Sequence, residues 1–295
     1  MLLRYALDVA PLWNTSEEFA EALNLLSPAT QARVTKYHFT ADRKLALGSQ
    51  LLQRLVISEV YSGGKPSASI PNLSSIPIIR DEKSGRPSYS PPPATEGRVW
   101  ELKDYNVSHH NSRNPSLPCL VILVARLAPP STGQQRIGVD LVPDAYNRSG
   151  SAQTFLEGFR SSGVFTDYEI GVIFSPLRND EKVKMLYLHW ALKEAYVKAV
   201  GTGLVTNLLA IEFRGVNLHD TEDGAYEGVE VYIDGEKRPE WKLEVGRLSR
   251  GHYFAAATDG RDGRDGGDGG EDIGGWKWIE FRKDIWDAWG EPVVN

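Results

Sequence analysis

The feature that most constrains the fold is a helical segment that runs from Asn179 to Val200 and is ended by Gly201. A spacing of about 100° per residue places four of its side chains on one arc, those of Trp190, Lys193, Glu194 and Lys198. A carboxylate beside a bulky apolar ring has an energetic cost unless a cation or a phosphate-bound metal compensates its charge. We therefore expect a site for Mg²⁺ and phosphate on this face of the helix.

A buried strand upstream of the helix, residues 137–141, carries the acid that would complete such a site, Asp140. Taken alone, Asp140 also fits an ordinary turn or cap acid at the end of a strand. Glu194 and Lys198 are four residues apart, which also fits a solvent-exposed helix pair. On these residues alone, both interpretations stay open.

Helical patterns followed by strand patterns occur twice along the chain. In the first half, a capping box that begins at Thr15 and a periodic helical segment over 42–61 precede strands at 106–109 and 119–124. In the second half, a capping box that begins at Thr166 and the long helix precede four further strands, 211–213, 229–233, 241–245 and 252–257. These patterns predict an α+β fold, and the repetition is compatible with a duplicated unit.

The halves are expected to join between Thr132 and Arg136, which gives an N-terminal α+β subdomain of residues 1–134 and a C-terminal one of 135–295. The second subdomain carries the expected metal site. Residues 259–275 are rich in Gly and Asp and are expected to form a flexible, solvated loop. The segment 276–286 is expected to add a strand or to dock aromatic side chains.

Composition excludes several classes of function. The formal net charge is −6, of which residues 259–272, with six acids and two arginines, supply −4, so no general affinity for nucleic acid is expected. The single cysteine, Cys119, excludes an internal disulfide framework and fits a reducing compartment such as the cytoplasm. Asp8 and Pro11 interrupt the N-terminal segment before a signal-peptide apolar region develops, and no apolar run approaches a membrane span, so no membrane partner is expected.

Five short motifs follow one another along most of the chain. They are the basic helix pattern of Arg33, Asp42 and Lys44, the turn Gly85-Arg86-Pro87, the strand Asn106-Val107-Ser108-His109, the strand Ile137-Gly138-Val139-Asp140 and the helix motif Trp190-x-x-Lys193-Glu194-x-x-x-Lys198. In this order the chain resembles the 4'-phosphopantetheinyl transferase superfamily of the larger, Sfp-like type, particularly its fungal and animal members. The last two motifs together are the most specific.

The resemblance implies two similar subdomains related by a pseudo-two-fold axis, with a site for coenzyme A (CoA) between them. It implies transfer of the 4'-phosphopantetheine arm of CoA to a serine of a carrier protein, with release of adenosine 3',5'-bisphosphate. It also implies that Asp140 and Glu194 hold Mg²⁺, with Mn²⁺ as an alternative, against the diphosphate of CoA. Zinc is disfavoured because no Cys/His cluster is present.

The resemblance also assigns roles to side chains. Lys198, with Lys193 beside it, would neutralise charge on the diphosphate, and Glu194, directly or through a bound water, is the hypothesis for the general base. Asp140, Glu194 and Lys198 are therefore the catalytic candidates. The 3'-phosphate of CoA needs separate donors, for which the candidates are Arg33, Lys44, Arg86, Ser108 and His109. Arg86 and His109 lead this group.

One departure keeps a second function open. Many bacterial members of the family carry Glu two residues after the metal-binding Asp, where this chain has Val142, as in the fungal and animal branch. A weaker metal site would suit a catalytically idle homologue that binds CoA or a carrier domain as an adaptor. A third class, a small-molecule nucleotide enzyme, ranks last because neither a Walker-type loop nor a dinucleotide fingerprint occurs.

By resemblance, the partners are carrier domains of fatty-acid, polyketide and non-ribosomal peptide synthases and of aminoadipate reductase. These would place the chain in lysine biosynthesis or secondary metabolism. The sequence does not separate the carriers, because that choice depends on surface shape. Fusion of two similar halves in one chain favours a monomer.

Overall fold

The computed structural model describes residues 1–91, 99–111, 119–133, 135–146, 150–203, 206–218, 222–260 and 275–290. Within this part of the chain, helices and mainly antiparallel sheets occur together, which confirms the predicted α+β class. The chain divides into two units: the first holds the described residues up to 133 and those from Trp276 onward, and the second holds those from 135 to 275. Most of the Gly/Asp-rich loop predicted at 259–275 lies outside the described residues.

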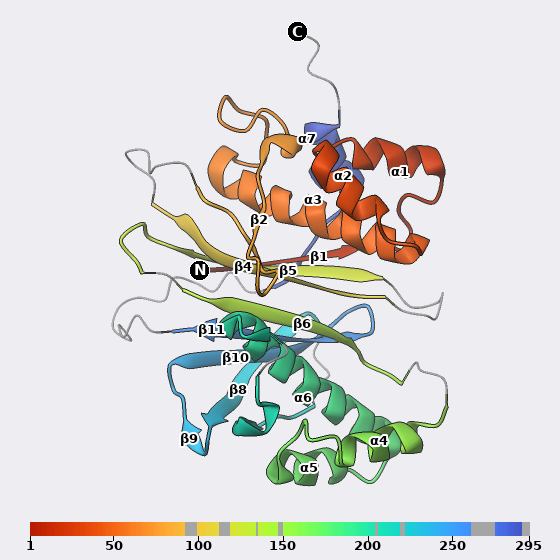
Figure 1. Ribbon diagram of the computed structural model, residues 1–295, viewed down its shortest axis with the longest axis vertical. Helices are drawn as coiled ribbons and strands as arrows, with labels where there is room; N and C mark the ends of the chain where they lie inside the picture. The colour runs from red at the N-terminus through yellow and green to blue at the C-terminus, as the bar shows by residue number, and fades with distance from the viewer. Residues whose placement is uncertain are drawn as a thin grey trace. The chain divides into compact units, whose positions relative to one another are not determined.

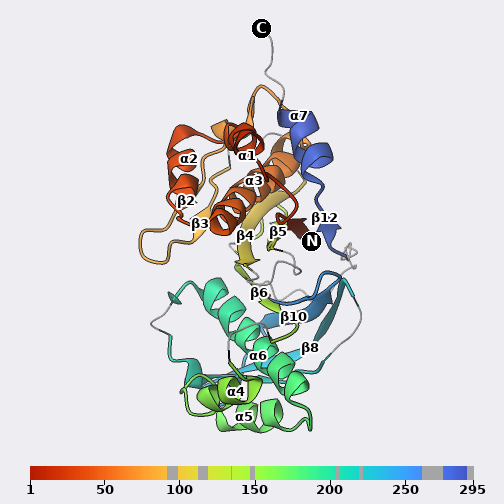
Figure 2. The same ribbon diagram turned by 90° about the vertical axis from the view of Figure 1, so that its right-hand side faces the viewer.

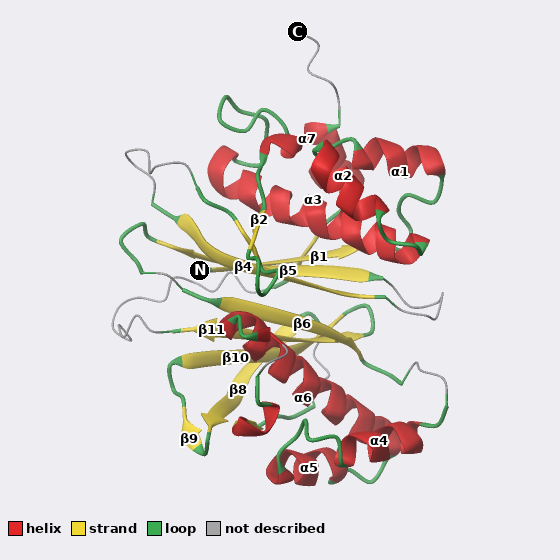
Figure 3. Cartoon of the chain, in the orientation of Figure 1, coloured by secondary structure: helices red, strands yellow, loops and turns green. Residues whose placement is uncertain are grey.

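The first unit is built on a four-stranded sheet with the order β12, β1, β5, β4. Its strands, drawn in yellow in Figure 3, are β1 (Leu2–Asp8), β4 (Glu101–His110), β5 (Leu120–Ala128) and β12 (Lys277–Trp278). β5 pairs antiparallel with β1 and β4, whereas β12 pairs parallel with β1. A two-stranded hairpin, β2 (Ile79–Arg80) and β3 (Pro87–Ser88), precedes β4. The sequence patterns did not predict β1.

Helix α3 (Thr40–Ser62) covers one face of this sheet (Figure 1). Its Leu47, Leu51 and Leu55 share one apolar core with Val121 and Leu123 of β5. The predicted periodic segment is thereby confirmed. The helix ends at Gly63, whose backbone is in the left-handed region that favours glycine at a helix C-terminus. Around it lie α1 (Ser16–Leu23), whose predicted capping box is present, α2 (Pro28–Thr35) and the 3-10 turn η1 (Leu73–Ser75).

The C-terminal segment returns to the first unit, as Figure 2 shows for β12 and α7. The backbone N–H of Ile279 donates to the carbonyl of Ala6 at 2.8 Å. A π-helical turn, η4 (Phe281–Trp286), and α7 (Asp287–Trp289) follow, and Ile285 and Trp289 are buried in the first unit's core. The prediction that 135–295 form one subdomain is therefore wrong for this segment, because its apolar side chains are buried against the first unit.

The second unit packs helix α6 (Asn179–Val200) on a three-stranded antiparallel sheet with the order β10, β11, β6. These strands are β6 (Ile137–Pro143), β10 (Trp241–Leu248) and β11 (His252–Asp259). A second sheet contains β7 (Ile211–Arg214), β8 (Gly224–Ile233) and β9 (Glu236–Lys237). Helices α4 (Ala152–Arg160) and α5 (Asp167–Phe174) pack against α6, and the 3-10 turn η3 (Leu208–Ala210) leads into β7. The predicted bounds of α6 and the capping box of α5 are confirmed.

Each unit by itself thus has one long helix on a mainly antiparallel sheet, as the expected duplication requires. The pseudo-two-fold axis and the CoA site between the halves stay predictions. No helix in the described part of the chain combines the length and the apolar character needed to cross a bilayer.

Close approach of α6 to β6 depends on Gly138. A Cβ atom at this position would lie 2.0 Å from the carbonyl oxygen of Ala195 and 2.5 Å from the amide nitrogen of Ala199. Both are backbone atoms of α6, which no side-chain rotation can move away. Gly138 is therefore the position that lets the helix lie directly on the strand that carries Asp140.

Candidate active site

Asp140 lies in the middle of β6 and is directed at helix α6. Side chains alternate between the two faces of a strand, so Asp140 shares its face with Gly138 and Val142. Its neighbour across the sheet on β11 is Ala255, whose small side chain is buried in the core beneath α6. The carboxylate therefore reaches the helix at the point where Gly138 allows the two backbones to meet.

Lys198 of α6 meets this carboxylate. Its Nζ atom donates to Oδ1 of Asp140 at 2.5 Å and to the backbone carbonyl of Val139 at 3.1 Å. The lysine side chain is 29% exposed, so the ammonium is partly open to solvent while it is fixed to the strand. The structure thus brings together two of the predicted catalytic residues from segments almost sixty positions apart.

Glu194 lies one helical turn before Lys198 and is half-buried. Burial raises the pKa of its carboxyl group, the negative charge of Asp140 raises it further, and the positive charge of Lys198 opposes both. Among the described residues, the Glu194 carboxylate has no hydrogen-bonding partner of its own. The two carboxylates and the ammonium of Lys198 thus form a small charged site where the helix crosses the strand, and the charge of Asp140 there disfavours the ionised form of Glu194.

The donor set fits a hard divalent cation. In the described part of the chain, no group of three or more His, Cys, Asp or Glu side chains could hold a metal ion, which argues against an all-protein metal cage there. Mg²⁺ is commonly bound by one or two carboxylates, with the remaining positions filled by water and substrate phosphates. Asp140 and Glu194 supply that number of carboxylates. Val142, on the same face, is buried in the apolar core and adds no oxygen.

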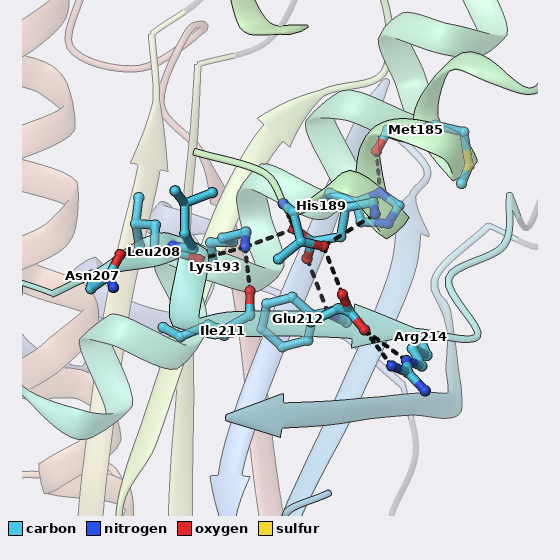
Figure 4. Close-up of polar contacts among 12 residues, drawn as sticks. Met185, His189, Lys193, Asn207, Leu208, Ile211, Glu212 and Arg214 are labelled. Carbon is cyan, nitrogen blue, oxygen red and sulfur yellow. Dashed lines mark hydrogen bonds and ion pairs between the residues drawn. The ribbon is translucent and has the colours of Figure 1, made fainter. Parts of the chain in front are cut away.

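The placement of Lys193 corrects the sequence prediction. It does not share the face of Glu194 and Lys198, because its side chain is only 1% exposed and its ammonium pairs with Glu169 of α5 at 2.8 Å. The same ammonium donates to the carbonyls of Leu208 at 2.8 Å and Ile211 at 2.5 Å, as Figure 4 shows. All three protons are used, so this lysine is not available to a phosphate group.

Trp190 does not belong to the site face either. It is half-buried against Phe159 of α4, with ring centroids 5.9 Å apart. At about 100° per residue the four side chains span an arc of roughly 140°, which is wide enough for Lys193 at one end to contact other elements than Lys198 at the other end. Of the four residues predicted to lie together on α6, only Glu194 and Lys198 face Asp140.

Two candidates for the 3'-phosphate lie at the helices of the first unit. Arg33 of α2 is exposed, and its Nη2 donates to Oγ1 of Thr30 at 3.1 Å. Lys44 of α3 is buried instead, and its ammonium donates to Asn14 Oδ1 at 2.7 Å and to the carbonyl of Ala10 at 3.2 Å. Burial lowers the pKa of Lys44. Arg33 is therefore better placed than Lys44 to bind a phosphate from solvent.

The other three candidates lie on β4 and beside it. Arg86 forms an ion pair with Asp104 of β4. Ser108 is buried and His109 is exposed, and as neighbours on a strand they point to opposite faces of the sheet. The structure separates these two side chains, so a phosphate role of each stays a prediction to be tested on its own.

Arg86 offers a direct test of phosphate binding. We expect Arg86→Gln to raise the KM for CoA about tenfold or more, since a charge-assisted hydrogen bond contributes ~1.5–3 kcal/mol, while kcat at saturation changes little. Steady-state kinetics with CoA as the varied substrate measures this, and Arg43→Gln, at an arginine whose Nε donates to the carbonyl of Tyr37, is a matched control. Equal losses in kcat and in kcat/KM would contradict a pure binding role.

Sequence reasoning missed two residues that shape the site. Gly138 was noted only as part of a motif, although its missing side chain sets the distance between α6 and β6. The capping box that begins at Thr166 points to Glu169 only as its last residue, although the fully buried carboxylate of Glu169 also accepts from Lys193. A glutamate directly before the apolar run 170–174 was the available signal for the second.

Comparison with known protein families matches both halves of the chain. A family model described as "4'-phosphopantetheinyl transferase, N-terminal" covers residues 12–113. A second, described as "4'-phosphopantetheinyl transferase superfamily", covers residues 136–258 and so includes the Asp140 strand and helix α6. Together the two models span well over half of the chain.

Curated relatives extend over most of the chain as well. The 4'-phosphopantetheinyl transferase NpgA of Emericella nidulans is 29% identical, over 88% of this chain and 83% of its own length. Proteins named L-aminoadipate-semialdehyde dehydrogenase-phosphopantetheinyl transferase are 26% identical in Mus musculus, over 87% of this chain and 74% of the relative, and 28% identical in Schizosaccharomyces pombe, over 83% and 86%. With Asp140, Glu194 and Lys198 gathered where α6 crosses β6, these matches show that the chain belongs to the 4'-phosphopantetheinyl transferase superfamily.

Proposed function

We propose that this protein transfers the 4'-phosphopantetheine arm of CoA to a serine of carrier protein domains, with Mg²⁺ held by Asp140 and Glu194. The observation that supports it most is the meeting of Asp140, Glu194 and Lys198 at the crossing of β6 and α6. The two carboxylates provide oxygen ligands, and the partly open ammonium provides a positive charge for a diphosphate. Mn²⁺ is an alternative to Mg²⁺ at such a site.

The reaction replaces the phosphoanhydride bond of CoA by a phosphodiester bond to the carrier. A bond forms between the serine oxygen and the phosphorus next to the pantetheine, the bond from that phosphorus to the bridging oxygen breaks, and adenosine 3',5'-bisphosphate leaves with the electron pair. The bound cation supplies charge neutralisation at the diphosphate. Lys198 adds a positive charge as negative charge develops on the leaving group. Glu194 accepts the serine proton, a role for which a carboxyl with a raised pKa is suited.

A mass measurement on a carrier domain tests the proposal. The protein is incubated with CoA, Mg²⁺ and an apo carrier domain, and the intact carrier is then weighed. We expect a gain of one phosphopantetheine arm, its loss when the metal is chelated, and its return when Mg²⁺ is restored. Binding of CoA without a gain in carrier mass would instead favour the adaptor function that Val142 left open.

The names of the relatives suggest a first carrier to try. Several are named for L-aminoadipate-semialdehyde dehydrogenase, and we propose the carrier domain of such a reductase as one substrate, next to carriers of fatty-acid, polyketide and non-ribosomal peptide synthases. Rates on the four carriers in parallel would rank them. We further propose a cytoplasmic, monomeric enzyme, which fractionation and sedimentation would check.

The raised pKa of Glu194 predicts a pH dependence of stability in the metal-free protein. A folded-state pKa above the unfolded one means that ionisation of Glu194 destabilises the fold at neutral pH, whereas protonation below that pKa removes the cost. We therefore expect Glu194→Gln to have a Tm equal to or above that of the wild type at pH 7. The difference should disappear as the pH falls through the raised pKa. Thermal melts in the presence of a chelator measure both values, and a lower Tm of the variant at pH 7 would contradict the environment described for this carboxyl.

A further inference from the structure

The second unit contains a fully buried ion pair that the proposed chemistry does not use. Lys193 of α6 and Glu169 of α5 lie 2.8 Å apart, and their side chains are 1% and 0% exposed. The rings of Phe165 and Phe213 lie 5.9 and 6.0 Å from the lysine Nζ. The pair is therefore enclosed by apolar and aromatic groups.

The pair joins three segments of the chain. Glu169 Oε2 accepts from the backbone N–H of Thr166 at 2.9 Å, which caps α5, and Oε1 accepts from the N–H of Phe213 on β7 at 3.0 Å. Lys193 in turn holds the carbonyls of Leu208 and Ile211, at the start of the same strand. Figure 4 shows the contacts of Lys193 with the carbonyls of Leu208 and Ile211. One residue of α6 is thus fixed at once to the first turn of α5 and to β7.

Stability alone does not account for such a pair. Burial raises the pKa of Glu169 and lowers that of Lys193, in both cases against the attraction between them. A buried ion pair can often be replaced by well-packed apolar residues of similar volume with no loss of stability, because desolvation offsets the attraction. Each polar atom of the ion pair must meet a particular donor or acceptor, so the pair selects one geometry. Apolar side chains in its place would not impose that geometry.

That geometry bears on the neighbouring residue. Lys193 precedes Glu194, and consecutive helix residues point about 100° apart. With Lys193 held toward α5 and β7, Glu194 is directed toward β6, where the charge of Asp140 acts on it. A rotation of α6 about its axis that turned Glu194 away from Asp140 would also pull Lys193 out of these contacts.

We propose that the Glu169–Lys193 pair is a positioning device that fixes the rotation of α6 and thereby holds Glu194 beside Asp140. The inference rests on the proposed role of Glu194 in cation binding and proton transfer. It predicts that loss of the pair weakens Mg²⁺ binding in a protein that is still folded. Removal of a group that orients a metal ligand without binding the metal itself typically lowers metal affinity or activity about 10- to 100-fold.

The decisive variant replaces both partners with apolar residues, Glu169→Leu with Lys193→Met. We expect a folded protein with a lower Tm, because the N–H of Phe213 and the carbonyls of Leu208 and Ile211 lose these partners. At a temperature where the variant is folded, we also expect a loss of about tenfold or more in the affinity for Mg²⁺, titrated calorimetrically into the enzyme with CoA bound. Turnover should fall through kcat, with the KM for CoA unchanged. Lys193→Met alone should lower the Tm markedly, because Glu169 is left buried and unpaired.

An exposed pair of the same unit provides the matched control. Glu230 and Lys237 lie 2.5 Å apart on β8 and β9, with both side chains more than 40% exposed. Glu230→Leu with Lys237→Met should leave Mg²⁺ affinity and kcat unchanged. Wild-type Mg²⁺ affinity and kcat in the buried double variant would overturn the positioning role.

Two further variants keep the result interpretable. Glu194→Gln tests the proposed function separately: if it leaves Mg²⁺ affinity unchanged, the metal site fails whatever the buried pair does. Should the double variant not fold, Glu169→Asp retains the charge but withdraws the carboxylate by one methylene. We then expect a lower kcat with an unchanged KM for CoA, and a wild-type kcat in this variant would also overturn the proposal.

Discussion

Replacement of Glu194 by glutamine is expected to lower the rate of carrier modification by about 10³-fold while the protein stays folded. Positioned general bases contribute typically ~10²–10⁴-fold, and this carboxylate is also proposed to bind the cation. The amide has nearly the same shape but neither accepts the serine proton nor carries the charge. Single-turnover measurements with saturating CoA, Mg²⁺ and apo carrier give the rate, and circular dichroism verifies the fold.

Glu157→Gln on α4 is a suitable control, since that side chain is 46% exposed and outside the proposed site. It should leave the rate within twofold of the wild type, as expected for a surface substitution away from the chemistry. A Glu194→Gln enzyme that retained most of the activity would remove this residue from both proposed roles, and the base would then have to be sought elsewhere.

Replacement of Gly138 by alanine should have the largest effect on stability. The added Cβ would lie 2.0 Å from a backbone oxygen of α6 and 2.5 Å from a backbone nitrogen, so the helix must move off the strand. Overpacking that side chains can absorb costs ~1–3 kcal/mol, and backbone atoms cannot move aside as side chains do, so we expect a loss of about 3 kcal/mol or more. Urea unfolding at constant m-value would measure it.

The same variant should also lose activity under conditions where it is still folded. Displacement of α6 from β6 carries Glu194 and Lys198 away from Asp140, so kcat should fall even at low temperature. Gly158→Ala on α4 is the matched control, because nothing lies within 4 Å of its added Cβ. This helical change should stabilise the protein by about 0.5–1 kcal/mol. Equal effects of the two glycine substitutions would contradict the close approach described for Gly138.

Local patterns predicted many elements of this protein. The capping boxes of α1 and α5 and the bounds of α6 depend on contacts within a few residues, and they are present as expected. Strand β1 was not predicted, and the segment that contains β12 was assigned to the wrong unit. Their place depends on pairing between Leu2–Asp8 and residues beyond Trp276, and no short-range pattern records such a pairing.

The residues of the candidate site also divide into those that the sequence predicted correctly and one that it did not. The order of motifs along the chain was enough to identify the family and to single out Asp140, Glu194 and Lys198, because these residue types at these spacings are specific in combination. The same motif wrongly suggested Lys193 as a phosphate ligand. Helical spacing gives the angle between two side chains but not which elements pack against each of them.

The sequence by itself thus determined the class of fold, through local periodicity, and the chemical groups available, through residue types, while the order of its motifs carried the resemblance to the family. Only the tertiary structure decided which role each charged side chain of α6 has. Glu169 and the carbonyls before β7 surround Lys193 in a dry core, whereas a glycine on β6 brings Asp140 up to Lys198. The physical reason is that the ionisation and reach of a charged side chain depend on what lies around it, and those surroundings come from parts of the chain that are distant in sequence.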